Sequence, residues 1–533
     1  MDKKLLLGAE AIALGALDAG ISGVYAYPGT PSTEITEYIQ KQNPDKERPV
    51  RSSWSTNEKT AYEAALGMSY AGKRSLVCMK HVGLNVAADA FINSAITGVN
   101  GGLVIAVADD PSMHSSQNEQ DSRVYGKFAM VPVLEPSSQQ DLYNATIEAF
   151  DLSESVGLPV LLRLTTRLAH SRAGVKRTAA RLQNPLHSIY APERFVLIPH
   201  HARQQYNLLL NIQEKLEKLS EQSWLNRLIS GSGPNGVIAF GIAFNYVMEI
   251  RQAFDLNFPV LQIGQYPLPR KHIETLFKFC DTILVAEEGY PVYEELLRGY
   301  LGGGNIRGRL DGTLPRAGEL NADIIAKGLG IERKKVRQVP DIVVNRPPAL
   351  CKGCGHRDLY AALNIVMSSF AEHHVFSDIG CYTLGALEPF NAIHTCVDMG
   401  ASITMAKGAA DAGLQPAVAV IGDSTFTHSG MTGLLDAIND KSPLTVIIAD
   451  NDTTAMTGGQ SSSATGSRLL DICRGLGVAE QHIRTIIPLK SHHKENMTVL
   501  KEEITYKGVS VVIAQRECIE SAARKKRNQA ART

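Results

Sequence analysis

The stretch Pro416-Ala-Val-Ala-Val-Ile-Gly-Asp-Ser424 predicts a buried strand that ends at a glycine and a carboxylate. A second apolar run, Leu444-Thr-Val-Ile-Ile-Ala449, leads directly into Asp450-Asn451-Asp452-Thr453. Asp423 and Asn451 are 28 positions apart. Because open parallel sheets bind ligands at the carboxyl ends of their strands, these two side chains are expected to meet in one crevice.

The rest of the chain repeats this pattern, with short apolar runs alternating with amphipathic helical segments. Such alternation predicts parallel sheets covered by helices on both faces, so the expected fold class is α/β. A helix is expected at residues 57–71, with Asn57 as its N-cap. The expected strands lie at residues 23–27, 75–79, 102–107, 158–164, 236–240, 258–263, 282–286, 416–421, 444–449 and 509–514.

Length and composition exclude several classes of protein. With 533 residues the chain is too long for one hydrophobic core, and at roughly 150 residues per domain it suggests about three or four domains. Hydrophobic residues make up 44 %, and 54 Lys and Arg balance 54 Asp and Glu, which argues against disorder and against a globally basic nucleic-acid-binding protein. No apolar run approaches about 18 residues, and Glu10 and Asp18 interrupt the apolar start, so we expect no membrane span and no signal peptide. A cytoplasmic protein is expected, whose eight cysteines are thiols, catalysts or metal ligands.

Three parallel-sheet α/β domains are expected along the chain. The first spans residues 1–185 and is followed by a polar connecting segment at 186–230. A smaller domain at 231–340 ends near a Pro-rich boundary, and a third domain spans 341–520. Residues 521–533 carry five basic side chains without apolar periodicity, so a disordered, solvated tail is expected there.

The residues after the strands at 416–421 and 444–449 suit a metal and a diphosphate. Asp423 and Asn451 offer the hard oxygen ligands that Mg²⁺ prefers. Gly422 permits close backbone approach, and the segment from Ser429 opens a helix whose free N–H groups can bind a diphosphate. A lone Gly-Asp pair, by contrast, is usually only a turn.

The complete arrangement, Gly-Asp followed by Asn 28 positions after the Asp, resembles the thiamine diphosphate motif. The words Gly422-Asp-Ser-Thr-Phe-Thr-His-Ser-Gly430 and Asn451-Asp-Thr-Thr-Ala-Met-Thr-Gly-Gly-Gln460 are similar to those of the 2-oxoacid:ferredoxin oxidoreductases. The resemblance implies that Asp423 and Asn451 ligate Mg²⁺ through side chains and Thr453 through its backbone carbonyl. The cofactor-binding residues that it implies in this domain are Gly422, Asp423, Ser424, Ser429, Asn451 and Thr453.

A second cofactor contact is expected in the first domain. Thiamine diphosphate needs a buried glutamate at N1′ of its aminopyrimidine. In Ser52-Ser-Trp-Ser-Thr-Asn-Glu58, a carboxylate stands where a strand becomes a helix. By pattern alone, a glutamate in this position is more often an ordinary first-turn residue that the helix dipole stabilises.

Longer motifs resemble the large subunit of the indolepyruvate ferredoxin oxidoreductases. They are Tyr27-Pro-Gly-Thr-Pro-Ser-Thr-Glu34, Asn57-Glu-Lys59, Met79-Lys-His-Val-Gly-Leu-Asn85 and Asp109-Asp-Pro-Ser-Met-His-Ser-Ser-Gln-Asn-Glu-Gln-Asp121, and the similarity extends from about residue 5 to 520 in the family's domain order: pyrimidine-binding, transketolase-C-like, diphosphate-binding. It implies that Glu58 contacts the pyrimidine and that Thr30 lies beside the 2-oxo acid.

Other polar residues of these motifs are weaker candidates. Lys80, His81 and His114 belong to the same loops and could contact substrate or coenzyme A, or could be structural hydrogen-bond partners. Arg123 is a candidate partner for the substrate carboxylate, because a guanidinium binds carboxylates in a bidentate fork.

Four cysteines could provide an electron path. Cys351-Lys-Gly-Cys354 supplies two thiols, and Cys381 and Cys518 each follow an expected strand. Thiolates that converge at the strand ends of one sheet suit a [4Fe–4S] cluster or tetrahedral zinc. The family resemblance implies the cluster. The remaining cysteines, Cys78, Cys280, Cys396 and Cys473, are expected to be buried thiols.

Two features depart from the family pattern. The usual Cys-Pro-Gly-Cys-Pro-His-Arg is Cys351-Lys-Gly-Cys-Gly-His-Arg357 here. The family's large subunit also continues into a ferredoxin-like domain with two cysteine-rich motifs, which this sequence lacks up to Thr533. The electron acceptor is therefore expected to be a separate ferredoxin or a ferredoxin-like subunit.

The resemblance implies oxidative decarboxylation of an aryl 2-oxo acid, such as indolepyruvate, to an acyl-coenzyme A. It implies thiamine diphosphate, Mg²⁺, a [4Fe–4S] cluster and coenzyme A, together with a small beta subunit in a dimer or heterotetramer; neither nucleic acid nor membrane is an expected partner. The alternatives are a non-oxidative thiamine diphosphate-dependent decarboxylase or ligase with structural cysteines, and a catalytically inactive scaffold for electron-transfer partners.

Overall fold

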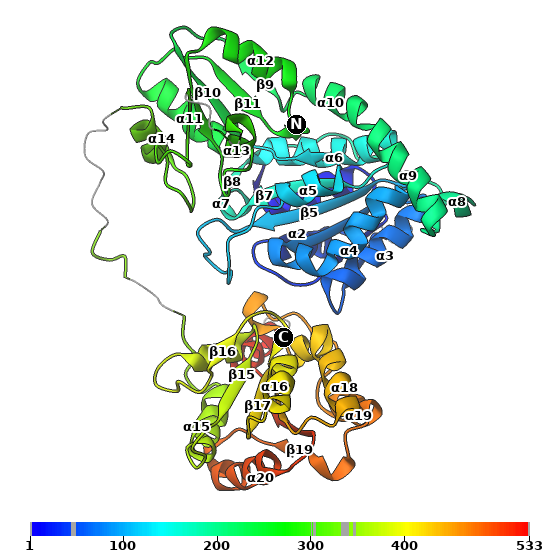
Figure 1. The fold of residues 1–533 in the computed structure, drawn as a ribbon, viewed down its shortest axis with the longest axis vertical. Coiled ribbons are helices and arrows are strands. Elements are labelled where there is room, and N and C mark those ends of the chain that lie inside the picture. Colours follow the sequence, from blue (N-terminus) through cyan, green and yellow to red (C-terminus); the bar gives the residue numbers. More distant parts are fainter. Residues whose placement is uncertain are drawn as a thin grey trace. The chain divides into compact units, whose positions relative to one another are not determined.

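The chain divides into two units, Met1–Gln338 and Val339–Thr533, in a computed structural model (Figure 1). The structure describes residues 3–43, 49–299, 301, 305–331, 340–344 and 348–530. Among the described helices, none has both the length and the apolar character needed to cross a membrane. The further division of the first unit into two domains stays a prediction.

A seven-stranded sheet forms the centre of the first unit, and all its strands are parallel except the edge strand β12. Its inner strands β4, β5 and β7 are buried along their whole length, as expected for a parallel sheet covered on both faces. The strands, in spatial order, are β12 (Gln265–Tyr266), β6 (Val133–Leu134), β7 (Val160–Thr165), β5 (Leu103–Asp109), β4 (Ser75–Lys80), β2 (Gly23–Ala26) and β3 (Arg51–Trp54).

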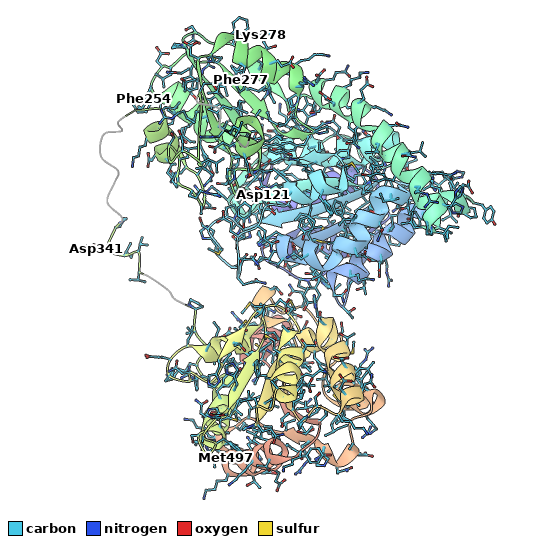
Figure 2. All side chains as sticks on the ribbon, in the orientation of Figure 1. Asp121, Phe254, Phe277, Lys278, Asp341 and Met497 are labelled. Carbon is cyan, nitrogen blue, oxygen red and sulfur yellow. The ribbon has the colours of Figure 1, made fainter. Side chains whose placement is uncertain are left out.

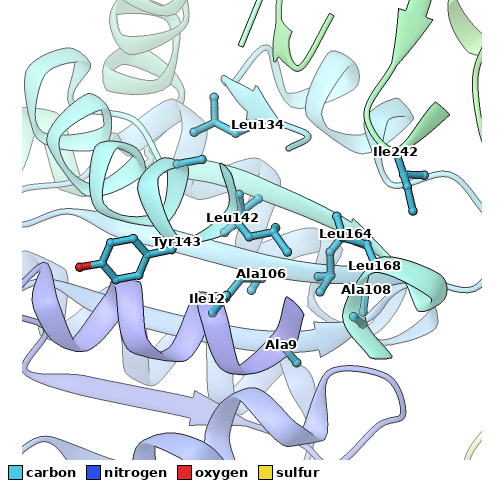
Figure 3. Close-up of a cluster of buried hydrophobic side chains, with 14 of the residues drawn as sticks. Ala9, Ile12, Ala106, Ala108, Leu134, Leu142, Tyr143, Leu164, Leu168 and Ile242 are labelled. Carbon is cyan, nitrogen blue, oxygen red and sulfur yellow. The ribbon is translucent and has the colours of Figure 1, made fainter. Parts of the chain in front are cut away.

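Helices cover both faces of this sheet because alternate strand residues face opposite sides. Leu76 and Ala106 face the core shared with α1 (Gly8–Asp18), α2 (Thr33–Gln42) and α6 (Gln139–Val156). Figure 3 shows α1 and α6 packed together there, with Ile12 beside Ala106. The other face packs against α3 (Glu58–Tyr70) and α4 (His81–Thr97).

A second, five-stranded sheet continues the same core. Its strand order is β14 (Ile306–Arg307), β13 (Thr282–Ala286), β10 (Asn235–Phe240), β11 (Val260–Ile263) and β9 (Arg227–Ile229). Residues on both sheets belong to one hydrophobic cluster, and Ile242 lies near Leu164 and Leu168 (Figure 3). Strand β12 comes from this part of the chain and pairs with β6 of the first sheet. The two sheets are therefore joined by backbone as well as by side chains.

The remaining elements of the first unit are a strand pair and peripheral helices. Strands β1 (Lys3–Leu7) and β8 (Arg172–Lys176) pair antiparallel. The helices are α5 (Arg123–Ala129), α7 (Thr166–His170), α8 (Pro192–Phe195), α9 (Pro199–Asn211), α10 (Gln213–Glu221), α11 (Ala243–Ala253), α12 (Arg270–Phe279), α13 (Val292–Arg298) and α14 (Ala322–Gly328).

The second unit contains a six-stranded, entirely parallel sheet between two helical layers. Helices α15 (Gly355–Met367) and α20 (His493–Thr505) cover one face, while α16 (Ala401–Asp411), α18 (Met431–Asp440) and α19 (Ser467–Leu476) cover the other. The strand order is β16 (Thr395–Cys396), β15 (His374–Ser377), β17 (Ala417–Gly422), β18 (Thr445–Asp450), β20 (Ser510–Gln515) and β19 (Ile483–Ile486). The α/β fold class is confirmed.

The expected disordered tail is wrong for residues 521–530. They belong to helix α21 (Ile519–Ala530), and residues 531–533 lie outside the described part of the chain. The local sequence pattern did not indicate this helix, but contacts with other segments hold it. The guanidinium of Arg524 donates to the carbonyls of Gly458 and Gly459, and Lys525 lies 2.7 Å from a carboxylate oxygen of Glu517.

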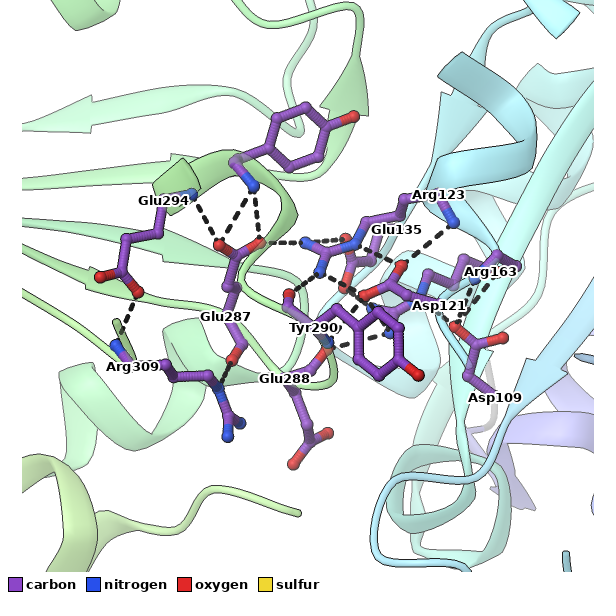
Figure 4. Close-up of polar contacts among 12 residues, drawn as sticks. Asp109, Asp121, Arg123, Glu135, Arg163, Glu287, Glu288, Tyr290, Glu294 and Arg309 are labelled. Atoms are coloured by element: carbon purple, nitrogen blue, oxygen red, sulfur yellow. Dashed lines mark hydrogen bonds and ion pairs between the residues drawn. The ribbon is translucent and has the colours of Figure 1, made fainter. Parts of the chain in front are cut away.

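A buried network of charges ties the two sheets of the first unit together (Figure 4). Arg163 on β7 bonds Asp109 at 2.6 Å through Nε and contacts Glu135 through Nη1. Arg123 lies 2.6 Å from Asp121 and 2.9 Å from Glu287, which follows β13 of the second sheet. Asp121, labelled in Figure 2, has no exposed side-chain surface. The side chains of Arg123 and Arg163 are fully buried as well.

Removing one arginine from this network is expected to destabilise the first unit. Arg163→Ala leaves Asp109 and Glu135 buried without their cation, which should lower the free energy of unfolding by about 3–5 kcal/mol. Urea unfolding followed by tryptophan fluorescence measures this, because Trp54 and Trp224 are the only tryptophans and both lie in the first unit. The matched control, Arg270→Ala in an exposed pair with Glu274, should cost less than about 1 kcal/mol. Equal effects of the two changes would contradict the role assigned to the network.

Candidate active site

The sheet of the second unit reverses its strand order beside β17, and the candidate site follows that strand. The chain leaves β15 toward β16 on one side and returns to β17 on the other. Ligands of open α/β sheets bind at such a switch point, beyond the carboxyl ends of the strands. Gly422 ends β17, Asp423 begins the short helix α17 (Asp423–Thr425), and a π-helical turn η2 (Phe426–Gly430) follows. Turns of this kind frequently mark functional sites.

Asp423 is a buried carboxylate that is not fully satisfied. Its side chain is buried, and within the described residues Oδ2 has no hydrogen-bond partner. Burial, and then the negative charge of Asp450, raise the pKa of Asp423 to about 8. A cation bound to Asp423 would favour the charged carboxylate, so the side chain fits a Mg²⁺ ligand.

The loop after β18 brings the other predicted ligands to Asp423's side of the sheet. The Thr454 hydroxyl lies 3.0 Å from that of Ser424, so this loop contacts the turn that follows β17. Asn451 Oδ1 accepts a hydrogen bond from the Thr453 amide at 3.2 Å, and the buried Thr453 hydroxyl donates to the Gln460 carbonyl. In the described part of the chain, no three His, Cys, Asp or Glu side chains are grouped as a metal-ion site. Of the three magnesium ligands predicted from sequence, only Asp423 is of these types.

Ser429 lies within η2, in a run of helical turns that begins at Asp423 and continues into α18. The expectation that a helix opens at Ser429 with free N–H groups is therefore wrong. The Ser429 hydroxyl is 2.5 Å from His428 Nδ1, and its Cβ approaches Gly400, which precedes α16, so closely that a side chain at 400 would overlap it. Ser429 therefore occupies the junction between η2 and the start of α16.

The four predicted cluster ligands line one cavity. Cys351, Cys354, Cys381 and Cys518 surround a volume of about 330 Å³, together with Asp450 and Asn451. They come from the turn before α15, the loop after β15 and the segment after β20. The Cys518 amide donates to the Asn451 carbonyl at 3.0 Å, so the thiol cavity and the metal-ligand loop share a wall.

The environment of these thiols favours their neutral form. Burial, and then the charges of the other thiols of the set, raise the pKa of Cys381 to about 12. Burial likewise raises the pKa of Cys354. Thiolates there would need the positive charge of bound iron or zinc. In the described residues the four thiols line one cavity but are not grouped closely enough to form a metal-ion site.

The remaining cysteines follow the prediction with one exception. Cys78, Cys280 and Cys473 are buried, but Cys396 is exposed. The expectation of a buried thiol was wrong because Cys396 ends β16, a strand of two residues at the edge of the sheet.

Tyr382, which motif analysis missed, packs between the thiol loop and the Asp423 strand. A Cβ at Gly380 or Gly422 would lie 2.2 or 2.5 Å from its ring, so both glycines are needed for this packing. The tyrosine hydroxyl donates to Asp378, a buried carboxylate whose pKa burial raises to about 6. The ring also meets that of His356 edge to face at 6.3 Å. The sequence signal that could have indicated this packing is the position of Asp378 and Tyr382 on either side of Gly380-Cys381.

The predicted residues of the first unit lie at the carboxyl edge of its first sheet. Glu58 is the first residue of α3 and is buried, and Asn57 caps that helix by accepting a hydrogen bond from the Thr60 amide at 2.9 Å. His81, the first residue of α4, lies 3.2 Å through Nε2 from the Asn118 carbonyl.

Neighbouring loops bring further candidates together. Lys80 donates to the Ser115 carbonyl at 2.7 Å, and the Ser115 hydroxyl lies 3.4 Å from the carbonyl of Thr30. Burial lowers the pKa of Lys80 to about 8. His114 is half-exposed and lies 3.2 Å from Glu319, so the contact that the structure shows for it is structural.

Arg123 does not lie where a substrate carboxylate would meet it. Its guanidinium is fully buried and contacts Asp121 and Glu287. The guanidinium of Arg123 thus binds carboxylates of the protein itself.

Known proteins are similar to this chain in sequence. The model for "Pyruvate flavodoxin/ferredoxin oxidoreductase, thiamine diP-bdg" matches residues 14–207, and that for "Thiamine pyrophosphate enzyme, C-terminal TPP binding domain" matches residues 378–514. Indolepyruvate oxidoreductase subunit IorA of Methanothermobacter thermautotrophicus is 38 % identical, with 98 % of this chain and 88 % of the relative covered. The subunits of Archaeoglobus fulgidus (39 %) and Pyrococcus horikoshii (38 %) match over 97 % of this chain and 86 % of their own length.

The chain belongs to the indolepyruvate oxidoreductase IorA family. This confirms the resemblance drawn from the motifs and places the chain among the 2-oxoacid:ferredoxin oxidoreductases. Both matched models describe thiamine diphosphate-binding domains, and their ranges contain Glu58 and the Asp423–Asn451 pair, respectively. A solved 2-oxoglutarate:ferredoxin oxidoreductase from Magnetococcus marinus aligns with 58 % of this chain and 62 % of its own, at a TM-score of 0.49 and 17 % identity, a likeness too weak to bear on function.

The packing of Tyr382 in this IorA-family chain can be tested with a single methyl group. Gly422→Ala places a Cβ against the tyrosine ring and should lower the free energy of unfolding of the second unit by about 1–3 kcal/mol. Thermal unfolding followed by circular dichroism measures the change. Gly475→Ala in α19, where the space around the glycine is open, serves as the control and should be neutral or slightly stabilising. A Gly422→Ala variant as stable as this control would show that the tyrosine does not need the glycine.

Proposed function

We propose that the chain is the catalytic subunit of an enzyme that oxidatively decarboxylates an aryl 2-oxo acid such as indolepyruvate. The balanced reaction is R–CO–COO⁻ + CoA–SH → R–CO–S–CoA + CO₂ + H⁺ + 2e⁻. Family membership supports the 2-oxo acid and the thiamine diphosphate, and the relatives' name supports indolepyruvate. Coenzyme A as acceptor of the acyl group rests on the family resemblance of the motifs.

The observation that carries the proposal is the shared wall between two sites. The thiols of Cys351, Cys354, Cys381 and Cys518 line a cavity that Asp450 and Asn451 also line. A non-oxidative decarboxylase has no need of four thiols beside its cofactor, whereas an oxidoreductase needs an electron acceptor there. We therefore assign a [4Fe–4S] cluster to these cysteines and Mg²⁺ to Asp423, Asn451 and the Thr453 carbonyl.

Thiamine diphosphate, when bound, supplies the carbanion chemistry that cleaves the 2-oxo acid. In the proposed site the protein's residues bind and orient it. Gly422, Ser424 and Ser429 would hold the diphosphate at the strand end, and the Glu58 carboxylate would hold the proton at N1′ of the pyrimidine. Thr30, His81 and His114 would surround the substrate, with Lys80 behind them.

The two electrons need a destination outside the chain. We propose a ferredoxin or ferredoxin-like protein as acceptor, and a small beta subunit that completes the enzyme as a dimer or heterotetramer. The relatives' designation as a subunit supports a multisubunit assembly.

Removing the proposed magnesium ligand should weaken cofactor binding without lowering the stability of the protein. Asp423→Asn keeps the shape but loses the charge, so Mg²⁺-dependent thiamine diphosphate affinity should fall by more than about tenfold. The apo-protein should be at least as stable as the parent, because one of two facing buried carboxylates is gone. Isothermal titration calorimetry and thermal melts measure the two effects.

Asp436→Asn on the exposed face of α18 is the control and should change neither quantity. Unchanged cofactor affinity in the Asp423 variant would remove Asp423 from the proposed site.

The cluster assignment predicts which cysteines hold iron. Anaerobically purified protein should contain about four irons per chain, and Cys351→Ser or Cys518→Ser should lower the iron content and the visible absorbance. Cys396→Ser, an exposed thiol outside the cavity, should change neither. Protein without iron even after anaerobic reconstitution would overturn the electron path and favour the non-oxidative decarboxylase.

A further inference from the structure

A glycine in the first turn of α4 lies directly against the carboxylate of Glu58. A Cβ at Gly83 would lie 2.5 Å from Oε1, 2.6 Å from Cγ and 2.8 Å from Cδ of Glu58. Real Cβ atoms do not approach other atoms so closely, so any other residue at position 83 would move the glutamate. Both residues are buried.

Nothing in the backbone requires a glycine here. Gly83 lies inside the 17-residue helix α4 and is not among the glycines with positive φ. Alanine is the more favourable residue inside a helix, because glycine loses more backbone freedom on folding. A larger residue at position 83 would therefore disturb the contact with Glu58.

We propose that Gly83 is a positioning residue, whose missing side chain leaves the space in which α4 holds the Glu58 carboxylate for the pyrimidine of the cofactor. This inference rests on the role proposed above for Glu58. Strand β4 leads directly into α4, with Lys80 as the last strand residue and as the N-cap of the helix. The sheet therefore fixes Gly83, and the glycine determines how closely the glutamate approaches the helix.

Gly83→Ala should displace the carboxylate and weaken thiamine diphosphate binding by about tenfold or more, the size of effect typical when a supporting contact of a ligand group is lost. Isothermal titration calorimetry of the full chain in Mg²⁺ measures this. Magnesium with inorganic diphosphate, which lacks the pyrimidine, is the second probe and should bind Gly83→Ala as it binds the parent. Gly67→Ala in α3, where the space around the glycine is open, is the matched control and should leave both affinities unchanged.

A double-mutant cycle with Glu58→Ala separates positioning from general packing. Without the glutamate, the methyl group at position 83 has nothing to displace. Gly83→Ala should then cause no further loss of thiamine diphosphate affinity, and its effect on the melting temperature should be more favourable than in the parent. Gly67→Ala should shift the melting temperature equally in both backgrounds.

Three results would overturn the proposal, and they are distinguishable. Equal melting shifts for Gly83→Ala in both backgrounds would show that the contact does not exist. An equal loss of affinity in both backgrounds would mean that the methyl group meets the cofactor itself. A third result would be unchanged thiamine diphosphate affinity in Glu58→Ala, together with a melting shift for Gly83→Ala that still differs between the two backgrounds. It would confirm the contact but remove Glu58 from the proposed cofactor site.

Discussion

The buried charge network of the first unit constrains the loops that carry its candidate residues. Asp109 ends β5 and accepts hydrogen bonds from Arg163 and from the Ser122 amide. Asp121, at the far end of the loop that contains His114, is held by Arg123 and by the Tyr290 amide. Both ends of this loop are thus held by buried charged side chains. Since removing one member leaves another charge unpaired, the loop and the second sheet must fold together.

Asp423 presents the opposite situation in the second unit. Four carboxylates of the first unit's network each have an arginine within ion-pair distance: Asp109, Asp121, Glu135 and Glu287. Asp423 faces another carboxylate, and its Oδ2 has no partner in the part of the chain that the structure describes. A buried carboxylate beside another carboxylate, with one oxygen unsatisfied, carries a stability cost that a bound cation would offset. This contrast supports a ligand role more strongly than burial alone.

The sequence predicted the buried parallel strands, because their continuous apolar runs hardly depend on tertiary context. It also predicted the Asn57 cap, whose signal is local. The four cysteines line one cavity, but their role as cluster ligands stays a prediction. It missed the antiparallel pair of β1 and β8, which are short and half polar, and the transfer of β12 to the first sheet. Helix α21 was missed because Arg524 is held by carbonyls more than sixty positions away in the sequence. Each failure depends on a contact between distant segments.

The thiol cavity and the Asp423 turn of the second unit are connected to each other. Asp450 and Asn451 line the thiol cavity, yet the same loop reaches Ser424 beside Asp423 through Thr454. On the other side, Tyr382 connects the Cys381 loop to Gly422 through ring packing. A displacement of the Cys518 segment therefore reaches the Asp423 turn through hydrogen bonds, and a displacement of the Cys381 loop reaches it through packing. Such double connection is what a site would need if a metal-bound cofactor and an electron acceptor are to keep a fixed separation during turnover, because electron transfer depends on that separation.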